Sequence, residues 1–381
     1  MSLASPPATI PAFDYRAQLG PLRQEVLAAI TRVLDSSTLI LGPEVGAFEQ
    51  NFSRFLGVAG EAVGVGNGTD AIAIALRALG IELGDEVITA ANTAIPTVSA
   101  IRMVGARPVF CDVDADTLLM DLQQLEERIT PRTRAIVPVH LYGNAVDMTR
   151  LCQLAAERGL AVVEDCAQAC GTTWRGQMVG TFGDVGCFSF YPTKNLGAYG
   201  DGGLCFTRRP ELAQAMRQIR AYGCHDRYLA VREGVNSRLD ELQAAVLNVK
   251  LRYLPKWLAE RRAIAQSYET QLDPAIKRPR SGEAALHSYH LFVIESQRRD
   301  ELACALANEN IGYGVHYPTP IHLMPAYAPL GIARGSLPRT EAAAGRVISL
   351  PCYPELTEEA ISRVCTVVND TVVNDANQKS F

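Results

Sequence analysis

Short apolar runs that alternate with helix-like segments constrain this chain more than any other feature. The runs are rich in valine and isoleucine, which is typical of strands buried on both faces of a sheet. They lie at residues 62–66, 86–90, 107–113, 135–141, 160–165, 186–190 and 203–207. Helix patterns lie between them, including one at 118–128 and one at 147–158. We therefore expect an α/β domain with right-handed crossovers around one mostly parallel sheet and helices on both faces.

The length and the change of pattern after Arg208 predict two domains of unequal size. A chain of 381 residues is long for a single core. We place a large α/β domain at residues 36–255 and a smaller α+β domain at residues 256–381. Residues 1–35 are expected to pack on the smaller domain.

The composition excludes several classes of protein. The formal charge is -5, with acidic and basic residues mixed along the chain, which disfavours binding to nucleic acid. The start, MSLASPPATIPAF, has neither the basic region nor the apolar core of a signal peptide, and no apolar run could span a bilayer. The 10 cysteines include no CxxC pair and are interpreted as reduced, buried thiols. We expect a cytoplasmic protein that binds no membrane.

Polar features follow the predicted strands, at the edge where parallel sheets bind ligands. Asp165 ends the run LAVVED, where a buried carboxylate needs a cationic partner. GNGTDA, at residues 66–71, is a glycine turn that opens a helix and can bind an anion through free N–H groups. Lys194 follows the run FSFYP, and GVNSRLDE at 234–241 precedes another helix.

Each feature also has an ordinary explanation: a strand-end cap, a tight turn, an exposed lysine and a helix N-cap. No lysine follows GNGTDA to make a P-loop, and the run EVITA lacks the acidic residue that a nicotinamide dinucleotide needs. An anion cradle, a carboxylate for a ring nitrogen and a lysine for an aldehyde together suit pyridoxal 5'-phosphate. In this interpretation Lys194 carries the cofactor as a Schiff base and later moves a proton, while Asp165 keeps the ring nitrogen protonated.

With these residues in view, the chain resembles the DegT/DnrJ/EryC1/StrS family of sugar aminotransferases. The family has the aspartate-aminotransferase type of fold, fold type I of pyridoxal phosphate enzymes. The resemblance runs from LILGPEVGAFEQNF (39–52) to ISLPCYPELT (348–357). It is carried by VGNGTDA, VPVHLYG, VEDCAQACG, FSFYPTKNLGAYGDGG, GVNSRLDELQAAVL and VHYPTPIHL.

The resemblance implies the residues that bind the cofactor. Lys194 matches the Schiff-base lysine, Asp165 the partner of the pyridine nitrogen, and Gln168 the residue that hydrogen-bonds the phenolic oxygen. The matches to phosphate-binding positions are Gly68, Thr69 and Ser189. One departure is Ala94, which stands where many relatives carry an aromatic residue that stacks on the cofactor ring.

The resemblance also implies a homodimer with shared active sites, because Asn236 matches an asparagine that reaches the phosphate of the neighbouring subunit. The positions that match contacts to the sugar nucleotide are Tyr191, His316, Tyr317, Tyr222 and Arg238.

GAYGDGG and HYPTPIHL resemble the branch that aminates C3 of dTDP-3-keto-6-deoxyhexoses, with L-glutamate as the amino donor. The alternatives are a 4-aminotransferase of UDP- or dTDP-4-keto sugars, where GEGG is more usual, and a non-catalytic regulatory or binding relative. A sugar 3-dehydratase would have histidine in place of Lys194. No metal site is expected: His140 is interpreted as a packed strand-end residue, and His287 and His290 lie in a strand-like pattern.

Overall fold

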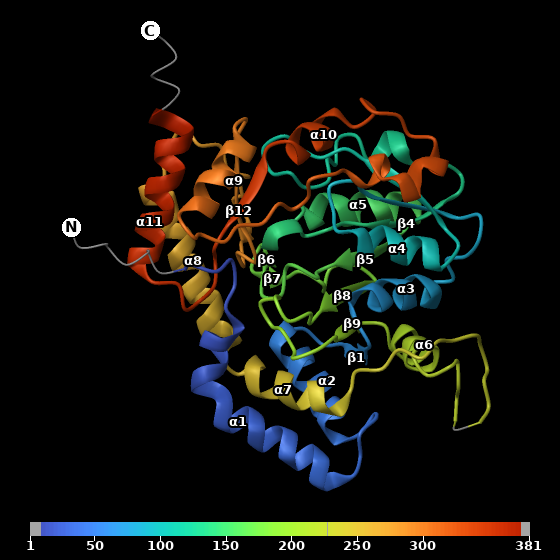
Figure 1. Ribbon diagram of the computed structural model, residues 1–381. Coiled ribbons are helices and arrows are strands. Elements are labelled where there is room, and N and C mark those ends of the chain that lie inside the picture. The colour runs from blue at the N-terminus through green and yellow to red at the C-terminus, as the bar shows by residue number, and fades with distance from the viewer. Residues whose placement is uncertain (1–8, 227, 375–381) are drawn as a thin grey trace.

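The computed structural model describes residues 9–226 and 228–374, and its centre is a seven-stranded sheet (Figure 1). The strands lie in the order β1-β9-β8-β5-β4-β2-β3. Their bounds are β1 (Glu61–Val65), β2 (Glu86–Ala90), β3 (Arg107–Cys111), β4 (Thr133–Val137), β5 (Ala161–Asp165), β8 (Val185–Ser189) and β9 (Gly203–Thr207). All neighbours pair in parallel except β9, which is antiparallel to β1 and β8. The mostly parallel sheet is thus confirmed; β9 runs the other way because no crossover helix separates it from β8.

Helices cover both faces of this sheet, as Figure 1 shows. One face carries α3 (Gly68–Ala78), α4 (Ile95–Met103) and α6 (Pro210–Ile219). The other carries α2 (Pro43–Leu56), α5 (Met148–Arg158) and α7 (Glu241–Leu251). In β5, Val162 joins one apolar cluster and Val163 the other, because successive side chains of a strand point to opposite faces. Valine-rich runs are therefore buried on both sides.

The prediction of a helix at residues 118–128 is wrong. Only η1 (Glu126–Arg128) is helical there, and Val113 instead bridges Met120. The Asp114 carboxylate accepts hydrogen bonds from the backbone N–H groups of Asp116 (3.0 Å) and Thr117 (2.8 Å). An aspartate that binds these N–H groups favours a turn over a helix.

A second apolar core forms around the antiparallel pair β11 (Phe292–Glu295) and β12 (Val347–Leu350). Its helices are α8 (Leu254–Gln271), α9 (Arg299–Asn308) and α11 (Glu358–Asn369), which lie together on one side of the molecule (Figure 1). The remaining elements are short: β6 (Thr173–Trp174), β7 (Gln177–Met178), β10 (Ala285–Leu286), η2 (Leu141–Gly143), η3 (Ile321–Leu323), η4 (Pro325–Leu330) and the π-helical η5 (Asp370–Asn374). None of the described helices is both long and apolar enough to cross a membrane.

The two cores share several segments. Ile10 pairs with Ile311 in the smaller core, but α1 (Tyr15–Ser36) packs on α7 of the larger one. α10 (Pro338–Ala344) also returns to the large sheet, where the Thr340 hydroxyl donates to Asp112 (2.7 Å). The domain boundaries at residues 36 and 255 therefore stay a prediction. Residues 1–8 and 375–381, at the two ends of the predicted domains, lie outside the described residues.

A buried carboxylate joins segments far apart in the sequence. Glu241, at the start of α7 and 1% exposed, accepts hydrogen bonds from the backbone N–H groups of Gly42 (2.8 Å), Glu44 (2.9 Å) and Val45 (2.8 Å). These are N–H groups at the start of α2, which has no capping side chain of its own at Gly42. A carboxylate on a helix N-terminus satisfies free donors and complements the helix dipole.

We expect Glu241→Ala to lower the free energy of unfolding by about 2–4 kcal/mol, because it leaves buried N–H groups without an acceptor. Glu241→Gln should lose less, since one acceptor oxygen remains. Urea denaturation measures both. Glu260→Ala, which removes a partly exposed carboxylate 3.7 Å from Lys256, is the control and should change stability by under about 0.5 kcal/mol. Equal losses for Glu241→Ala and the control would contradict the capping role.

Candidate active site

A cavity of about 250 Å³ opens at the carboxyl ends of the parallel strands. Its wall combines the first turn of α3, the start of α4 and the loops that follow β5 and β8. The lining residues are Asn67, Gly68, Thr69, Ile72, Thr93, Ala94, Pro96, Thr97, Val139, Asp165, Ala167, Gln168, Ser189, Tyr191, Lys194 and Asp201. The fold thus gathers residues from four separate segments that the sequence analysis singled out.

Asp165 lies in this wall as the last residue of β5 and is 5% exposed. One carboxylate oxygen accepts a hydrogen bond from the Thr97 hydroxyl (2.7 Å), and the other accepts from the backbone N–H of Ala167 (3.0 Å). Burial raises the pKa of Asp165, and these two hydrogen bonds act in the opposite direction. The carboxylate is held in a fixed orientation and would be further stabilised by a cation in the cavity.

Lys194 contributes the only lysine amine among the residues that line this cavity. Burial lowers the pKa of Lys194 to about 8, while the negative charge of Asp165 acts in the opposite direction. No hydrogen bond or ion pair joins the two groups in the described part of the chain, so the cavity separates them. An amine with this pKa is neutral in a useful fraction of molecules near neutral pH and can act as a nucleophile.

The start of α3 forms an anion cradle. Asn67 caps the helix by accepting from the N–H of Asp70 (2.9 Å), and Gly68 and Thr69 are its first residues. A Cβ on Gly68 would lie 2.7 Å from the Cβ of Ser189, so only glycine allows this close approach. N–H groups in the first turn of a helix have no intrahelical acceptor and attract anions such as phosphate.

Gln168 connects the cavity to Tyr142 and Tyr317, which both pack in the apolar cluster on the α2, α5 and α7 side of the large sheet. Its side-chain oxygen accepts from the N–H of Tyr142 (2.7 Å), and its amide nitrogen donates to the hydroxyl of Tyr317 (2.9 Å). The Tyr142 hydroxyl in turn donates to the backbone oxygen of His316 (2.6 Å). Burial raises the pKa of Tyr317 to about 12 and lowers that of His316 to about 4, so both are uncharged near neutral pH.

Five predicted site residues do not line this cavity: His316 and Tyr317, which lie beyond Gln168, and Asn236, Tyr222 and Arg238, which lie outside it. Asn236 is exposed and pairs with Ala221 through an isolated bridge. The Arg238 guanidinium lies 5.6 Å from the ring centroid of Tyr222, which is itself 52% exposed. Within one chain, Asn236, Tyr222 and Arg238 form an outer surface rather than a wall of the cavity.

Other residues of the site were missed from the sequence. Thr97, which orients Asp165, follows β2 in the segment AANTAIPT, and its hydroxyl also lies 2.8 Å from that of Thr93. Ser237 bonds both the N–H of Gly66 (2.9 Å) and the carboxylate of Asp70 (2.7 Å), so it ties the segment of Asn236 to the anion cradle. The position of Thr97 shortly after a parallel strand could have marked it as a site residue. Nothing in the sequence around Ser237 indicates its contacts.

A cluster of three residues next to the cavity has the residue types of a metal site, but the donor atoms of its histidine and glutamate are already engaged in hydrogen bonds. Donor atoms of His140, Glu164 and Cys166 lie within 4.8 Å of one another. Glu164 already accepts from three backbone N–H groups and lies 3.2 Å from the Nε2 of His140. The Nδ1 of His140 accepts from the N–H of Val146 (3.2 Å), so the histidine donates through Nε2. These hydrogen bonds explain the cluster as structural.

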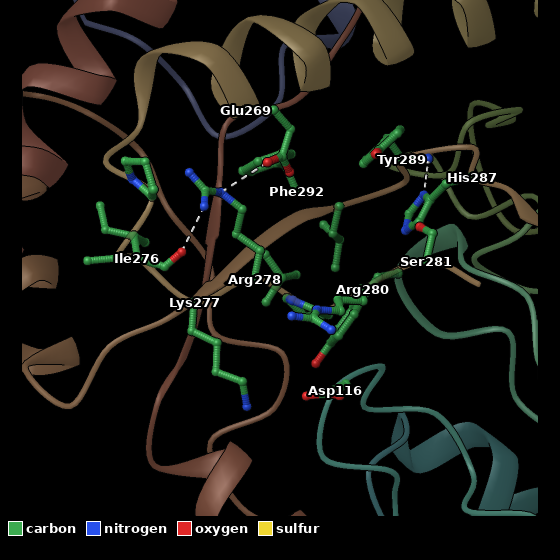
Figure 2. A pocket seen from close by; sticks show the side chains of 16 residues that line it. Asp116, Glu269, Ile276, Lys277, Arg278, Arg280, Ser281, His287, Tyr289 and Phe292 are labelled. Atoms are coloured by element: carbon green, nitrogen blue, oxygen red, sulfur yellow. Dashed lines mark hydrogen bonds and ion pairs between the residues drawn. The ribbon is translucent and has the colours of Figure 1, made fainter. Parts of the chain in front are cut away.

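A larger cavity of about 640 Å³ lies between the segment 274–281 and β11 (Figure 2). Two of the three lysine and arginine side chains in its wall are paired with carboxylates, Lys277 with Glu295 (3.0 Å) and Arg278 with Glu269 (3.4 Å). Among the described residues of its wall there is no predicted site residue and no pairing of a lysine with a strand-end carboxylate like that of Lys194 and Asp165. The smaller cavity is therefore the candidate active site.

Comparisons with known proteins agree with this geometry. Residues 21–369 match the DegT/DnrJ/EryC1/StrS aminotransferase family. The chain is 46% identical to a dTDP-3-amino-3,4,6-trideoxy-alpha-D-glucose transaminase of Micromonospora megalomicea subsp. nigra, over 94% of this chain and 98% of that protein. It is 43% identical to a pleiotropic regulatory protein of Geobacillus stearothermophilus, over 92% of this chain and 95% of that protein.

Solved structures give the same result. S. venezuelae DesV in complex with a ketimine intermediate superposes with a TM-score of 0.93 at 44% identity, covering 96% of this chain and 98% of that one. Bacillus subtilis NtdA with bound cofactor PMP gives 0.89 at 31% identity, covering 97% and 86%. The fold-type-I prediction is confirmed. This protein belongs to the DegT/DnrJ/EryC1/StrS aminotransferase family.

Proposed function

We propose that this protein is a pyridoxal 5'-phosphate-dependent aminotransferase that moves an amino group from L-glutamate to C3 of a dTDP-linked 3-keto-6-deoxyhexose. The observation that carries the proposal is the pair of Lys194 and Asp165, which line one cavity together with the N-terminus of α3. An amine, a buried carboxylate and an anion cradle are the protein groups that this cofactor requires.

The residues present fit the cofactor. The close approach of Gly68 to Ser189 leaves the first turn of α3 open for a phosphate, with Thr69 and Ser189 beside it. Asp165 would hold the ring nitrogen, Gln168 the phenolic oxygen and Lys194 the aldehyde carbon. When bound, the cofactor supplies an electron sink for the negative charge that develops beside the amino-acid α-carbon.

The chain's own groups perform the remaining steps. Asp165 would stabilise positive charge on the ring nitrogen, since it is buried and its orientation is fixed by Thr97 and the N–H of Ala167. The Lys194 amine would take a proton from the α-carbon of the amino donor and later deliver one to the sugar carbon. Its pKa of about 8 lets the same amine hold or release that proton near neutral pH.

The surroundings of the cavity suit a sugar nucleotide. Tyr191, 53% exposed, stands at the cavity wall. Tyr317 accepts a hydrogen bond from Gln168 of this wall, and the backbone oxygen of His316 accepts one from the Tyr142 hydroxyl. These uncharged donors and aromatic rings would contact the sugar. The choice of C3 is supported by GAYGDGG and HYPTPIHL and by the Micromonospora relative, whose name describes a 3-amino sugar transaminase.

We further propose a homodimer in which Asn236 reaches the partner's cofactor phosphate. Leu39, Ile40 and Leu41 are 51%, 46% and 39% exposed and adjoin this segment through a bridge between Ile40 and Asp240. An exposed apolar stretch beside a polar site is typical of a protein interface. A cytoplasmic location is proposed as well, because all ten cysteines are free thiols, as in a reducing compartment.

The substrate test uses the purified protein, L-glutamate and a panel of dTDP-3-keto, dTDP-4-keto and UDP-4-keto sugars. We expect amination at C3 of the dTDP-3-keto sugar, identified by mass and NMR. Lys194→Ala should lose activity by at least about 10²–10⁴-fold, the usual effect of removing an acid–base group. It should also lose the near-visible absorbance of the lysine-linked cofactor, while Lys256→Ala, an exposed control, keeps both.

Amination at C4 alone would replace this function with that of a 4-aminotransferase. A colourless protein that aminates none of the sugars would favour a regulatory relative. Turnover by Lys194→Ala at the wild-type rate would refute the catalytic assignment.

We expect Asp165→Asn to lower the aminotransferase activity and to lower the pKa of the Lys194 amine. The negative charge of Asp165 raises the pKa of Lys194, so its removal should bring that pKa below about 8. A change of one pKa unit corresponds to about 1.4 kcal/mol of difference in stabilisation between the charged and the neutral amine. The measurement is the pH dependence of Lys194 acylation in the cofactor-free protein, followed by peptide mass analysis. Asp201→Asn changes a carboxylate of the same cavity and should leave the amine unchanged. A raised pKa in Asp165→Asn would be inconsistent with this electrostatic pairing.

Subunit complementation tests the shared site. Asn236→Asp would oppose the phosphate with a negative charge, and Lys194→Ala removes the amine. In a mixed dimer one site would carry both defects and the other neither. Activity should therefore return to about a quarter of wild type, since about half of the dimers are mixed. The control mixes Lys194→Ala with Asp165→Asn, whose defects lie in the same wall of one chain, and should recover nothing. Without recovery by the first pair after proven exchange, Asn236 acts within its own subunit.

A further inference from the structure

The segment 190–198 that carries Lys194, hereafter the lysine loop, is a tightly closed loop. The N–H of Lys194 donates to the oxygen of Tyr191 (2.8 Å), and the N–H of Ala198 donates to the oxygen of Phe190 (2.8 Å). A Cβ on Gly197 would lie 2.3 Å from the backbone oxygen of Pro192. Because the two ends of the lysine loop touch, we expect a displacement of Gly197 to move Lys194 as well.

A second lysine holds the far end of this loop. The Nζ of Lys250, on α7, donates to the backbone oxygen of Gly197 (2.5 Å) and lies 4.6 Å from the ring centroid of Tyr199. Lys250 is 1% exposed and does not line the candidate active site. Burial lowers its pKa to about 8, and the negative charge of Glu355 acts in the opposite direction. A buried ammonium is unfavourable unless its partners compensate, so an apolar residue would serve mere packing better.

The opposite side of the lysine loop is held by the segment 288–290. Asn195, next to Lys194, donates to the backbone oxygen of Ser288 (3.1 Å), and its side-chain oxygen lies 3.3 Å from the Nδ1 of His290. Asn195 and His290 are both buried. The lysine loop is therefore fixed between α7 on one side and this segment on the other, which restricts where the Lys194 amine can lie.

We propose that Lys250 is a positioning residue: its hydrogen bond to Gly197 and its contact with Tyr199 set the place of the Lys194 amine relative to Asp165. Lys250 touches neither the cavity nor the reacting groups, so its effect passes through the lysine loop. The inference rests on the proposed function only in naming Lys194 as the reactive amine. A catalytic amine displaced by about 1 Å can lose rate about 10²-fold.

The test compares Lys250→Met, which keeps the length but removes the donor, with Lys250→Arg, which keeps the donor and the cation. Lys256→Met, an exposed lysine on α8, is the matched control. The first readout is the pH dependence of Lys194 acylation in the cofactor-free protein. We expect the Lys194 midpoint in Lys250→Met to rise from about 8 toward the ordinary value of 10.5, because a loosened loop exposes the amine. Lys250→Arg and Lys256→Met should stay near wild type.

The second readout is steady-state amine transfer. For Lys250→Met we expect kcat to fall about 10-fold to 100-fold while KM for L-glutamate changes less than about 3-fold. A variant with a lower melting temperature but an unchanged Lys194 titration and kcat would show a purely structural role and overturn the proposal. A shifted titration in a protein that transfers no amine would refute the proposed function and leave the positioning role standing.

If Lys250→Met does not accumulate as folded protein, Tyr199→Leu replaces it. This variant removes the ring beside the ammonium and leaves the bond to Gly197. A smaller shift of the Lys194 midpoint in the same direction supports the proposal, and an unchanged midpoint overturns it.

Discussion

The site depends on a carboxylate and an amine that line one cavity without touching. Asp165 is buried at the end of β5, and Lys194 lies in the loop after β8, the neighbouring strand. Burial disfavours the charge on each, raising the pKa of the acid and lowering that of the amine. Direct contact would neutralise both groups as an ion pair. Held apart, they leave room for a ligand that satisfies the acid and reacts with the amine.

Two adjacent acidic residues of β5 have different roles: Glu164 stabilises a loop, and Asp165 faces the cavity. Glu164 and Asp165 are consecutive in β5, so their side chains point to opposite faces of the sheet. Glu164 is enclosed by three backbone N–H groups and His140, which orders the loop around Gly180. Among the described residues, Asp165 accepts hydrogen bonds from the Thr97 hydroxyl and the N–H of Ala167 alone, so it retains capacity for a ligand. A shift of one residue in the register would exchange these roles.

Residues outside the cavity hold the lysine loop in place. Its reactive amine lines the cavity, the backbone oxygen of its Gly197 accepts a hydrogen bond from Lys250, and the side chain of its Asn195 donates to the backbone oxygen of Ser288. A loop with such supports keeps a catalytic group in place although loops are generally more mobile than strands. Lys250 and Ser288 lie 56 and 94 positions after Lys194 in the sequence.

Sequence patterns were enough to predict the class of the sheet and the main residues of the cavity. Valine-rich runs require burial on both faces, and the ends of parallel strands bring Gly68, Asp165 and Lys194 together. It did not determine the direction of β9 or the turn at 114–120, because local patterns do not report on strand partners or on an aspartate that binds backbone N–H groups. Three contacts became visible in the folded chain alone: Glu241 caps α2, Thr97 orients Asp165 and Lys250 donates to Gly197. Each of these contacts joins residues far apart in the chain, and such pairing follows from packing, which no local sequence pattern encodes.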